Sequence, residues 1–309
     1  MLRKTNTRLV KQRKPITKPT ITPPVPTPVP TTTESCTYIN GFATLIGDSN
    51  AKLALRSFIT AKNLTSIIYY TGSSLDNSTN RAYLRALNAQ ISIEKGANVT
   101  KSINAITTSD LGTPAGYNTT CLNANEKFTM FSQEWEFWKS NPNGDWEAFK
   151  TNDLAIYNFC QANNIVYNIY VARCKDPKVG GASPEEVADW LVAKHDTIYL
   201  VDYCTTDKFN TYQGLSPGIQ TQIQLIADAA KRFNNGAGKV QKISILWASE
   251  GNLVNGVPEN MRTFFAQNPS LIQAYTQFKV VYDNWTFTNK ASVQFVGQNI
   301  YAYSSLKDL

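Results

Sequence analysis

Short apolar runs alternate along the chain with longer stretches in which apolar residues recur three or four positions apart. Runs rich in β-branched and aromatic residues predict strands, whereas the wider spacing predicts amphipathic helices. Strands are predicted at residues 41–48, 66–71, 99–107, 128–136, 165–171, 197–203, 242–250 and 292–303. Helices are predicted at residues 50–59, 78–95, 145–163, from 183 onward, 216–234 and 258–281, with a polar loop at 109–125.

This alternation of strands and helices predicts an α/β fold. Eight strand signals separated by helices over about 270 residues match a (β/α)8 TIM barrel in length and rhythm. A doubly wound open sheet has the same local rhythm and is the main alternative. Residues 47–50 fit neither the dinucleotide-binding fingerprint nor the P-loop. We therefore predict a (β/α)8 barrel at residues 36–309, preceded by an arm at residues 1–35.

The arm differs from the rest of the chain in charge and composition. Residues 1–33 contain seven basic residues and no acidic one. Residues 19–33 form a Pro/Thr tract that favours an extended, semi-rigid backbone. Of the 30 basic residues, the 23 outside this segment equal the 23 acidic residues, so the net charge of +7 belongs to the arm. The body gives no reason to expect specific nucleic-acid binding.

Two interpretations of the arm remain open. It is either a disordered linker or an anchor, in which residues 1–33 bind an acidic surface or a larger protein assembly. The start lacks the apolar stretch of a secretory signal, and no later run has the length of a transmembrane helix. An anchoring arm fits an extracellular, surface-attached or virion-associated protein.

Cysteine and histidine give no indication of a metal or nucleophilic site. The five cysteines include no CxxC pair, which argues against a zinc site and a small disulfide scaffold. His195, the sole histidine, is predicted at the end of a helix, which disfavours a Ser-His-Asp site and a histidine-based metal site. We expect no metal and no cofactor.

Two carboxylates at the end of the fourth predicted strand are the strongest chemical signal. Glu134 and Glu136 are two positions apart, so in a strand both side chains point to the same side. A solvated strand end is the simplest alternative. In a barrel, the working face is built from the carboxyl ends of the strands. The other residues expected to line this face are Asp48, Tyr70, Trp138, Asp202, Tyr203, Trp247, Glu250 and Tyr301.

This set of residues is acidic and aromatic, which favours a glycan as substrate or ligand. Carboxylates serve as acids and nucleophiles at glycosidic bonds, and aromatic rings stack on sugar faces. The run FTMFSQEWE at residues 128–136 resembles the fourth-strand signature of family 18 glycoside hydrolases, which include chitinases and endo-β-N-acetylglucosaminidases. That signature is D-x-x-D-x-D-x-E. Thr129 and Ser132 replace its first two aspartates, and Glu134 stands at the third.

The resemblance implies a role for each acid. Glu136 would be the general acid that protonates the leaving oxygen. Glu134 would orient and stabilise the N-acetyl group of the substrate, which acts as the nucleophile. Tyr203 resembles the tyrosine that assists this group, although the family has Tyr-Asp where this chain has Asp202 before Tyr203. The tryptophan that the family carries on strand eight is absent.

Two alternatives to this mechanism remain. The lost aspartates and the arm fit a catalytically silent barrel that binds glycans or serves as a structural component of a surface or virion assembly. A different retaining mechanism would use Glu134 as the acid and Glu250, after the seventh strand, as the nucleophile, with the two carboxyl groups about 5–5.5 Å apart. Glu250 as a loop-ordering acid is the structural alternative.

Overall fold

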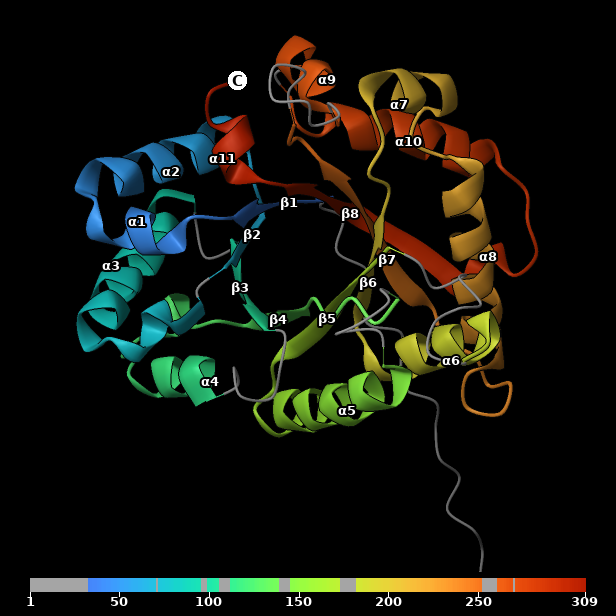
Figure 1. Ribbon diagram of the computed structural model, residues 1–309, viewed down its shortest axis with the longest axis horizontal. Coiled ribbons are helices and arrows are strands. Elements are labelled where there is room, and N and C mark those ends of the chain that lie inside the picture. The colour runs from blue at the N-terminus through green and yellow to red at the C-terminus, as the bar shows by residue number, and fades with distance from the viewer. Residues whose placement is uncertain are drawn as a thin grey trace, which may run out of the picture. The chain divides into compact units, whose positions relative to one another are not determined.

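Eight parallel strands close into a barrel in the computed structural model, in the order in which they occur along the chain (Figure 1). The structure describes residues 33–70, 72–95, 99–105, 112–138, 145–172, 182–251, 260–268 and 270–309. Each strand pairs with the next, and β8 pairs with β1 to complete the barrel. The predicted (β/α)8 barrel is confirmed. The strands are β1 (Glu34–Ile39), β2 (Ser66–Tyr69), β3 (Thr100–Ala105), β4 (Met130–Gln133), β5 (Val166–Val171), β6 (Thr197–Val201), β7 (Gln241–Ala248) and β8 (Val293–Tyr301).

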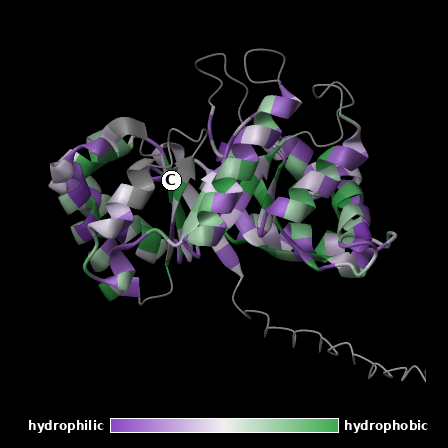
Figure 2. Ribbon diagram, turned by 90° about the horizontal axis from the view of Figure 1, so that it is seen from below, coloured by the Kyte–Doolittle hydropathy of each residue, from purple (hydrophilic) through white to green (hydrophobic). Residues whose placement is uncertain are grey.

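Helices surround the barrel on its outer side (Figure 1). Hydrophilic and hydrophobic residues alternate around them in Figure 2, as expected for helices with one face against the strands. The α-helices of the described residues are α1 (Phe42–Gly47), α2 (Ser49–Ala61), α3 (Ser78–Lys95), α4 (Gly112–Thr119), α5 (Trp146–Ala162), α6 (Pro184–Lys194), α7 (Thr206–Tyr212), α8 (Pro217–Arg232), α9 (Arg262–Gln267), α10 (Gln273–Asn284) and α11 (Tyr303–Leu306). Single 3₁₀ turns lie at η1 (Gly72–Asp76), η3 (Ala124–Glu126) and η5 (Lys290–Ser292).

Side chains alternate between the two faces of each strand and build two separate apolar layers. The larger layer lies between the strands and the helices, and includes Ile67 and Phe131. A smaller cluster includes Tyr38, Tyr170 and Leu246, whose neighbours along each strand belong to the outer layer. These alternate residues therefore face the barrel interior. The part of this interior nearest the carboxyl ends of the strands forms the floor of the candidate site.

The first strand lies earlier in the chain than predicted. Residues 41–48, predicted as a strand, contain helix α1, while β1 begins at Glu34. Gly41 precedes α1 with φ at 70°, a left-handed conformation that glycine adopts without strain. Asp48 accepts hydrogen bonds from the backbone N–H groups of Asn50 and Ala51 and so caps α2. The apolar residues at 41–48 are therefore part of the core, but they form a helix that packs on the outside of the barrel.

Two other parts of the prediction need comment. The segment 109–125, predicted as a loop, contains the helix α4. The helical region predicted at 258–281 contains two helices, α9 and α10, and its proposed start at Pro258 lies outside the described residues.

A buried polar network joins β5, α5 and α6 behind the barrel wall. Asp153 on α5 accepts hydrogen bonds from the hydroxyl of Tyr167 (2.6 Å), the indole N–H of Trp190 (2.7 Å) and Nε2 of His195 (3.1 Å). Nδ1 of His195 lies 3.0 Å from the carbonyl oxygen of Leu191. Both ring nitrogens of His195 thus lie within hydrogen-bond distance of an oxygen atom, one on α5 and one in the last turn of α6. The sole histidine is thus a structural residue.

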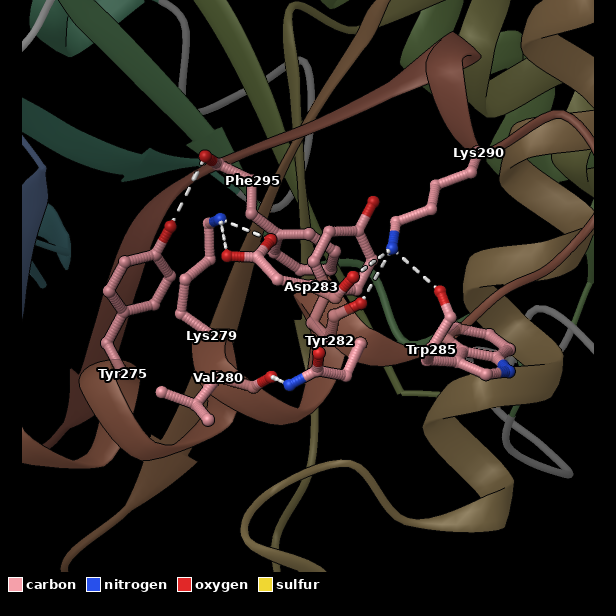
Figure 3. A network of polar contacts seen from close by, with 9 residues as sticks. Tyr275, Lys279, Val280, Tyr282, Asp283, Trp285, Lys290 and Phe295 are labelled. Carbon is pink, nitrogen blue, oxygen red and sulfur yellow. Dashed lines mark hydrogen bonds and ion pairs between the residues drawn. The ribbon is translucent and has the colours of Figure 1, made fainter.

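Lys290 fixes the connection between α10 and β8 (Figure 3). Its ammonium group donates hydrogen bonds to the carbonyl oxygens of Tyr282 (2.9 Å), Asp283 (2.9 Å) and Trp285 (2.7 Å) at the end of α10. It also lies 4.9 Å from the centre of the Tyr282 ring. A cation at the C-terminal end of a helix satisfies carbonyl groups that have no partner within the helix. Because Lys290 begins the turn before β8, these contacts set where that strand starts.

Candidate active site

Tyrosines from several strands gather with two carboxylates where the strands end at their carboxyl side. Glu134 and Glu136 follow β4, Tyr70 follows β2, and Tyr170 lies near the end of β5. The contacts described below bring together the predicted residues Tyr70, Glu134, Glu136, Trp138, Tyr203 and Tyr301, and add Tyr38 and Tyr170.

Glu134 is bound by the hydroxyl of Tyr70, which donates to its Oε2. Tyr70 packs in a three-ring cluster with Tyr38 and Tyr301, whose ring centres lie 5.6 and 5.9 Å from its own. Burial, and then the charge of Glu134, raise the pKa of Tyr70. Tyr70 therefore stays protonated and remains a hydrogen-bond donor.

Glu136 is bound by a residue of β5, the strand that lies on the opposite side of β4 from Tyr70. The hydroxyl of Tyr170 donates to Oε1 of Glu136 at 3.3 Å, and the ring of Trp138 packs 5.5 Å from that of Tyr170. Burial, followed by the charges of Glu136 and Glu134, raises the pKa of Tyr170, while a hydrogen bond with Tyr203 lowers it. Tyr203 is 44% exposed, so it connects Tyr170 to the surface.

Phe137 anchors the segment that carries both acids. Its side chain is fully buried, and its ring lies 4.4 Å from that of Phe149 and 5.2 Å from that of Trp146 on α5. The N–H of Phe137 donates to the carbonyl of Trp135 (2.9 Å), which turns the chain sharply after β4. The buried ring therefore fixes the two half-buried side chains beside it, Glu136 and Trp138.

Two hydroxyl groups lie on the floor of the site, close enough for a hydrogen bond between them. They belong to Ser132 and Tyr38, both buried. The charge of Glu134 contributes to raising the pKa of Tyr38, after burial itself. Ser132 stands where the family 18 signature has an aspartate, so position 132 supplies no carboxylate beneath Glu134.

Asp202 and Glu250, the other predicted acids, lie in the loops after β6 and β7. Asp202 accepts a hydrogen bond from the hydroxyl of Ser216 (3.3 Å) at the start of α8. Burial raises the pKa of Asp202 to about 6 and also raises that of Glu250. The charges of Glu250 and Glu134 both contribute to raising the pKa of Tyr301 to about 12, after burial, so Tyr301 is within electrostatic reach of both acids.

Trp247 and Asp48 do not occupy the positions expected of substrate contacts. Trp247 is fully buried and faces the helix layer, 5.7 Å from the ring of Phe209 and 6.3 Å from that of Phe278. Its predecessor Leu246 faces the barrel interior, so alternation directs Trp247 outward. Asp48 caps α2, as described above, which gives its carboxylate a structural role.

Sequence reasoning missed Tyr170 and Tyr38 as site residues. Tyr170 lies near the end of β5, which was predicted, and Tyr38 lies near the end of β1, which was not. The signal that could have identified such residues is an inward-facing position at the carboxyl end of a strand. Among the described residues, no group of three or more histidine, cysteine, aspartate or glutamate side chains is arranged to hold a metal ion. In the same residues, no helix combines the length and hydrophobicity needed to cross a membrane.

Comparison with known proteins supports the fold. No family model matches the sequence, and no curated protein matches it. A Group IV chitinase from Ostrinia furnacalis has a similar structure, with a TM-score of 0.50 and 10% identity over 89% of this chain and 94% of the chitinase. At this identity, the likeness establishes a shared barrel fold.

Two further solved barrels have lower TM-scores. A GH39 enzyme from Xanthomonas axonopodis pv. citri has a TM-score of 0.49 and 13% identity, over 88% of this chain and 58% of the enzyme. A monomeric dihydrodipicolinate synthase variant has a TM-score of 0.40 and 11% identity, over 71% of this chain and 63% of the synthase. The present chain thus spans less than two thirds of either protein, and the similar structures include glycosidases and other barrel enzymes.

Proposed function

We propose that this protein hydrolyses glycans that contain N-acetylglucosamine, by a retaining mechanism in which the substrate's own N-acetyl group is the nucleophile. The observation that carries the proposal is the placement of Glu136. It lies at the carboxyl end of the barrel strands, receives a hydrogen bond from Tyr170, and has Glu134 two positions before it. The presence of a chitinase among the barrels of similar structure agrees with this substrate class.

The two acids have different roles in this mechanism. Glu136 in its protonated form donates a proton to the glycosidic oxygen as the bond to the leaving sugar breaks. Glu134 in its ionised form stabilises the positive charge that develops as the N-acetyl oxygen attacks the sugar carbon. Trp138, Tyr203 and Tyr301 supply aromatic surface for the sugar rings.

A screen of purified protein on chitin oligomers, N-glycans and peptidoglycan tests the proposal, with Glu136→Gln as the critical variant. This variant keeps the shape and removes the transferable proton, so we expect activity to fall at least about a hundredfold. Glu94→Gln, which alters an exposed ion pair with Arg56, is the matched control and should retain full activity. Full activity of Glu136→Gln would refute the assignment. Loss of activity in Glu250→Gln with Glu136→Gln active would instead support the mechanism that uses Glu134 and Glu250.

A catalytically silent barrel is the second candidate, and the floor of the site favours it. Ser132 places a hydroxyl group where the resembled signature has an acid. A barrel of this kind would bind glycans without cleaving them. Binding of chitin oligomers by calorimetry, unchanged in Glu136→Gln and without any product, would establish this second function.

The arm supports attachment in either case. We propose that residues 1–33, with seven basic residues and no acid, bind an acidic surface or a protein assembly and hold the barrel there. Deleting these residues should leave a folded barrel. The deletion should abolish attachment in a co-sedimentation assay, and unchanged attachment would refute the role.

A further inference from the structure

The segment between β6 and α8 is closed on itself by a side chain. Asp202, directly after β6, accepts a hydrogen bond from the hydroxyl of Ser216, the residue before α8 (3.3 Å). The chain between them forms α7 and then returns to α8 (Figure 1). The N–H of Asp202 donates to the carbonyl of Leu246 in β7 (2.9 Å), which fixes its backbone to the barrel wall. The side-chain contact therefore ties the start of α8 to the end of β6.

The return from α7 to α8 is a tight turn held against the barrel. Gln213 and Gly214 both have a left-handed backbone, with φ at 49° and 79°. The N–H of Gly214 donates to the carbonyl of Phe209 in α7 (3.3 Å). Phe209 is buried, and its ring lies 5.7 Å from that of Trp247 in β7. Ser216 thus reaches Asp202 from a turn whose own position is fixed by packing.

Ser216 has two roles, and a second helix of the barrel shows one of them alone. The hydroxyl oxygen of Ser216 accepts from the N–H of Ile219 (3.4 Å) and so caps α8. Ser183 caps α6 in the same way, by accepting from the N–H of Glu186 (3.1 Å), and proline follows the cap in both helices. The hydroxyl of Ser216 also donates to Asp202, which a helix cap does not require.

The residue after Asp202 lies in the candidate site. Tyr203 is 44% exposed and forms a hydrogen bond with Tyr170, whose hydroxyl donates to Glu136. Since Tyr203 follows Asp202 directly, the contact at Asp202 limits where the backbone of Tyr203 can lie. The carboxylate of Asp202 is itself directed at Ser216 and the start of α8.

We propose that Asp202 is a positioning residue, which holds Tyr203 against Tyr170 by binding Ser216 at the start of α8. This inference rests on the proposed function, in which Glu136 is the acid and Tyr203 contacts the sugar. A misplacement of about 1 Å in a group that positions substrate can lower the rate roughly a hundredfold. The rate should therefore depend on a contact that lies outside the reacting groups.

NMR of protein labelled at the tyrosine Cζ carbons tests the proposal without a substrate, and Tyr203→Phe assigns the signal. Asp202→Ala and Ser216→Ala each remove the contact and should move the signal of Tyr203 equally, while the double variant should move it no further. Asp202→Asn keeps an oxygen that accepts from Ser216, so its signal should remain nearer that of the parent. The control is Ser183→Ala, which removes a helix cap alone and should leave the signal in place.

Hydrogen exchange of the backbone amides at residues 203–215 provides a second measurement. In Asp202→Ala, exchange there should become about tenfold faster, the value of one hydrogen bond to a charged group. If Asp202→Ala does not fold, Ser216→Ala breaks the same contact and decides the question. An unmoved Tyr203 signal in these variants, or an equal change in Ser183→Ala, would overturn the proposal.

The activity of the enzyme separates this inference from the proposed function. In an active enzyme, Asp202→Ala should lower kcat on a chitin oligomer roughly tenfold to a hundredfold, whereas Asp202→Asn should recover most of the rate and Ser183→Ala all of it. If the protein cleaves none of the glycans, the proposed function fails, while NMR and hydrogen exchange still decide whether Asp202 holds Tyr203. An active enzyme with unchanged kcat in Asp202→Ala would overturn the inference alone.

Discussion

Removal of the Asp153 carboxylate should destabilise the barrel more than any exposed substitution. Asp153 is fully buried and accepts from three donors, on Tyr167, Trp190 and His195, at 2.6–3.1 Å. Asp153→Ala leaves these groups buried without the carboxylate that they contact. Each buried donor left without an acceptor costs about 1–3 kcal/mol. We take about 4 kcal/mol as the expected loss, since the vacated space can admit water.

Thermal unfolding followed by circular dichroism measures this loss. For a domain of this size, about 4 kcal/mol corresponds to a fall in Tm of roughly 10 °C. Asp189→Ala is the matched control, because Asp189 forms an exposed ion pair with Arg232 on the neighbouring helices (2.8 Å) and should cost less than about 1 kcal/mol. A fall in Tm for Asp153→Ala no larger than that of the control would refute the reasoning. It would mean that the hydrogen bonds to Asp153 contribute little to the stability of the barrel.

Three further predictions concern the barrel and its site. Burial raises the pKa of Glu34 to about 7, so its contribution to stability is present below about pH 4.5 and is lost as the pH rises through 7. Glu34→Gln should therefore be about 3 kcal/mol more stable than the parent at pH 8 and similar at pH 4 in urea unfolding. Equal stability of the two proteins at both pH values would contradict this. Gly297→Ala should lower the free energy of unfolding by about 3 kcal/mol or more in thermal unfolding, because an added methyl group would clash with the carbonyl of Glu34. A change under 1 kcal/mol would show that the paired strands β1 and β8 can move apart to accommodate the methyl group. Tyr170→Phe should reduce kcat on a cleaved glycan about tenfold and leave Tm within a few degrees, whereas unaltered kcat would show that Tyr170 does not act on Glu136.

The barrel could be predicted because several of its strands, such as Val166–Val171 and Thr197–Val201, are runs of β-branched and aromatic residues flanked by clear helices. The first strand was missed for a local reason. The segment Glu34–Ile39 follows a threonine run and opens on two polar residues, so it carries a weak strand pattern, and the apolar residues at 41–48 gave a stronger one. Only the pairing of Cys36 with Ser66 and Asn299 in the neighbouring strands reveals its place in the barrel.

The site was predictable in part. Glu134 and Glu136 follow from their position after a buried strand, but the faces of other strands were ambiguous. Trp247 and Leu246 are both apolar, and a fully buried strand gives no alternation by which to tell the inner residue from the outer one. Tyr170 was missed for a related reason, since its contact with Glu136 depends on the turn at Phe137 and on the register of two strands.

The pairing of β1 with β8 has a consequence for how the protein faces its surroundings. Thr33 joins the barrel directly before Glu34, the first residue of β1, at the amino ends of the strands. Glu134 and Glu136 lie beyond the opposite, carboxyl ends. Whatever precedes Thr33 is therefore attached to the edge of the barrel remote from the two carboxylates.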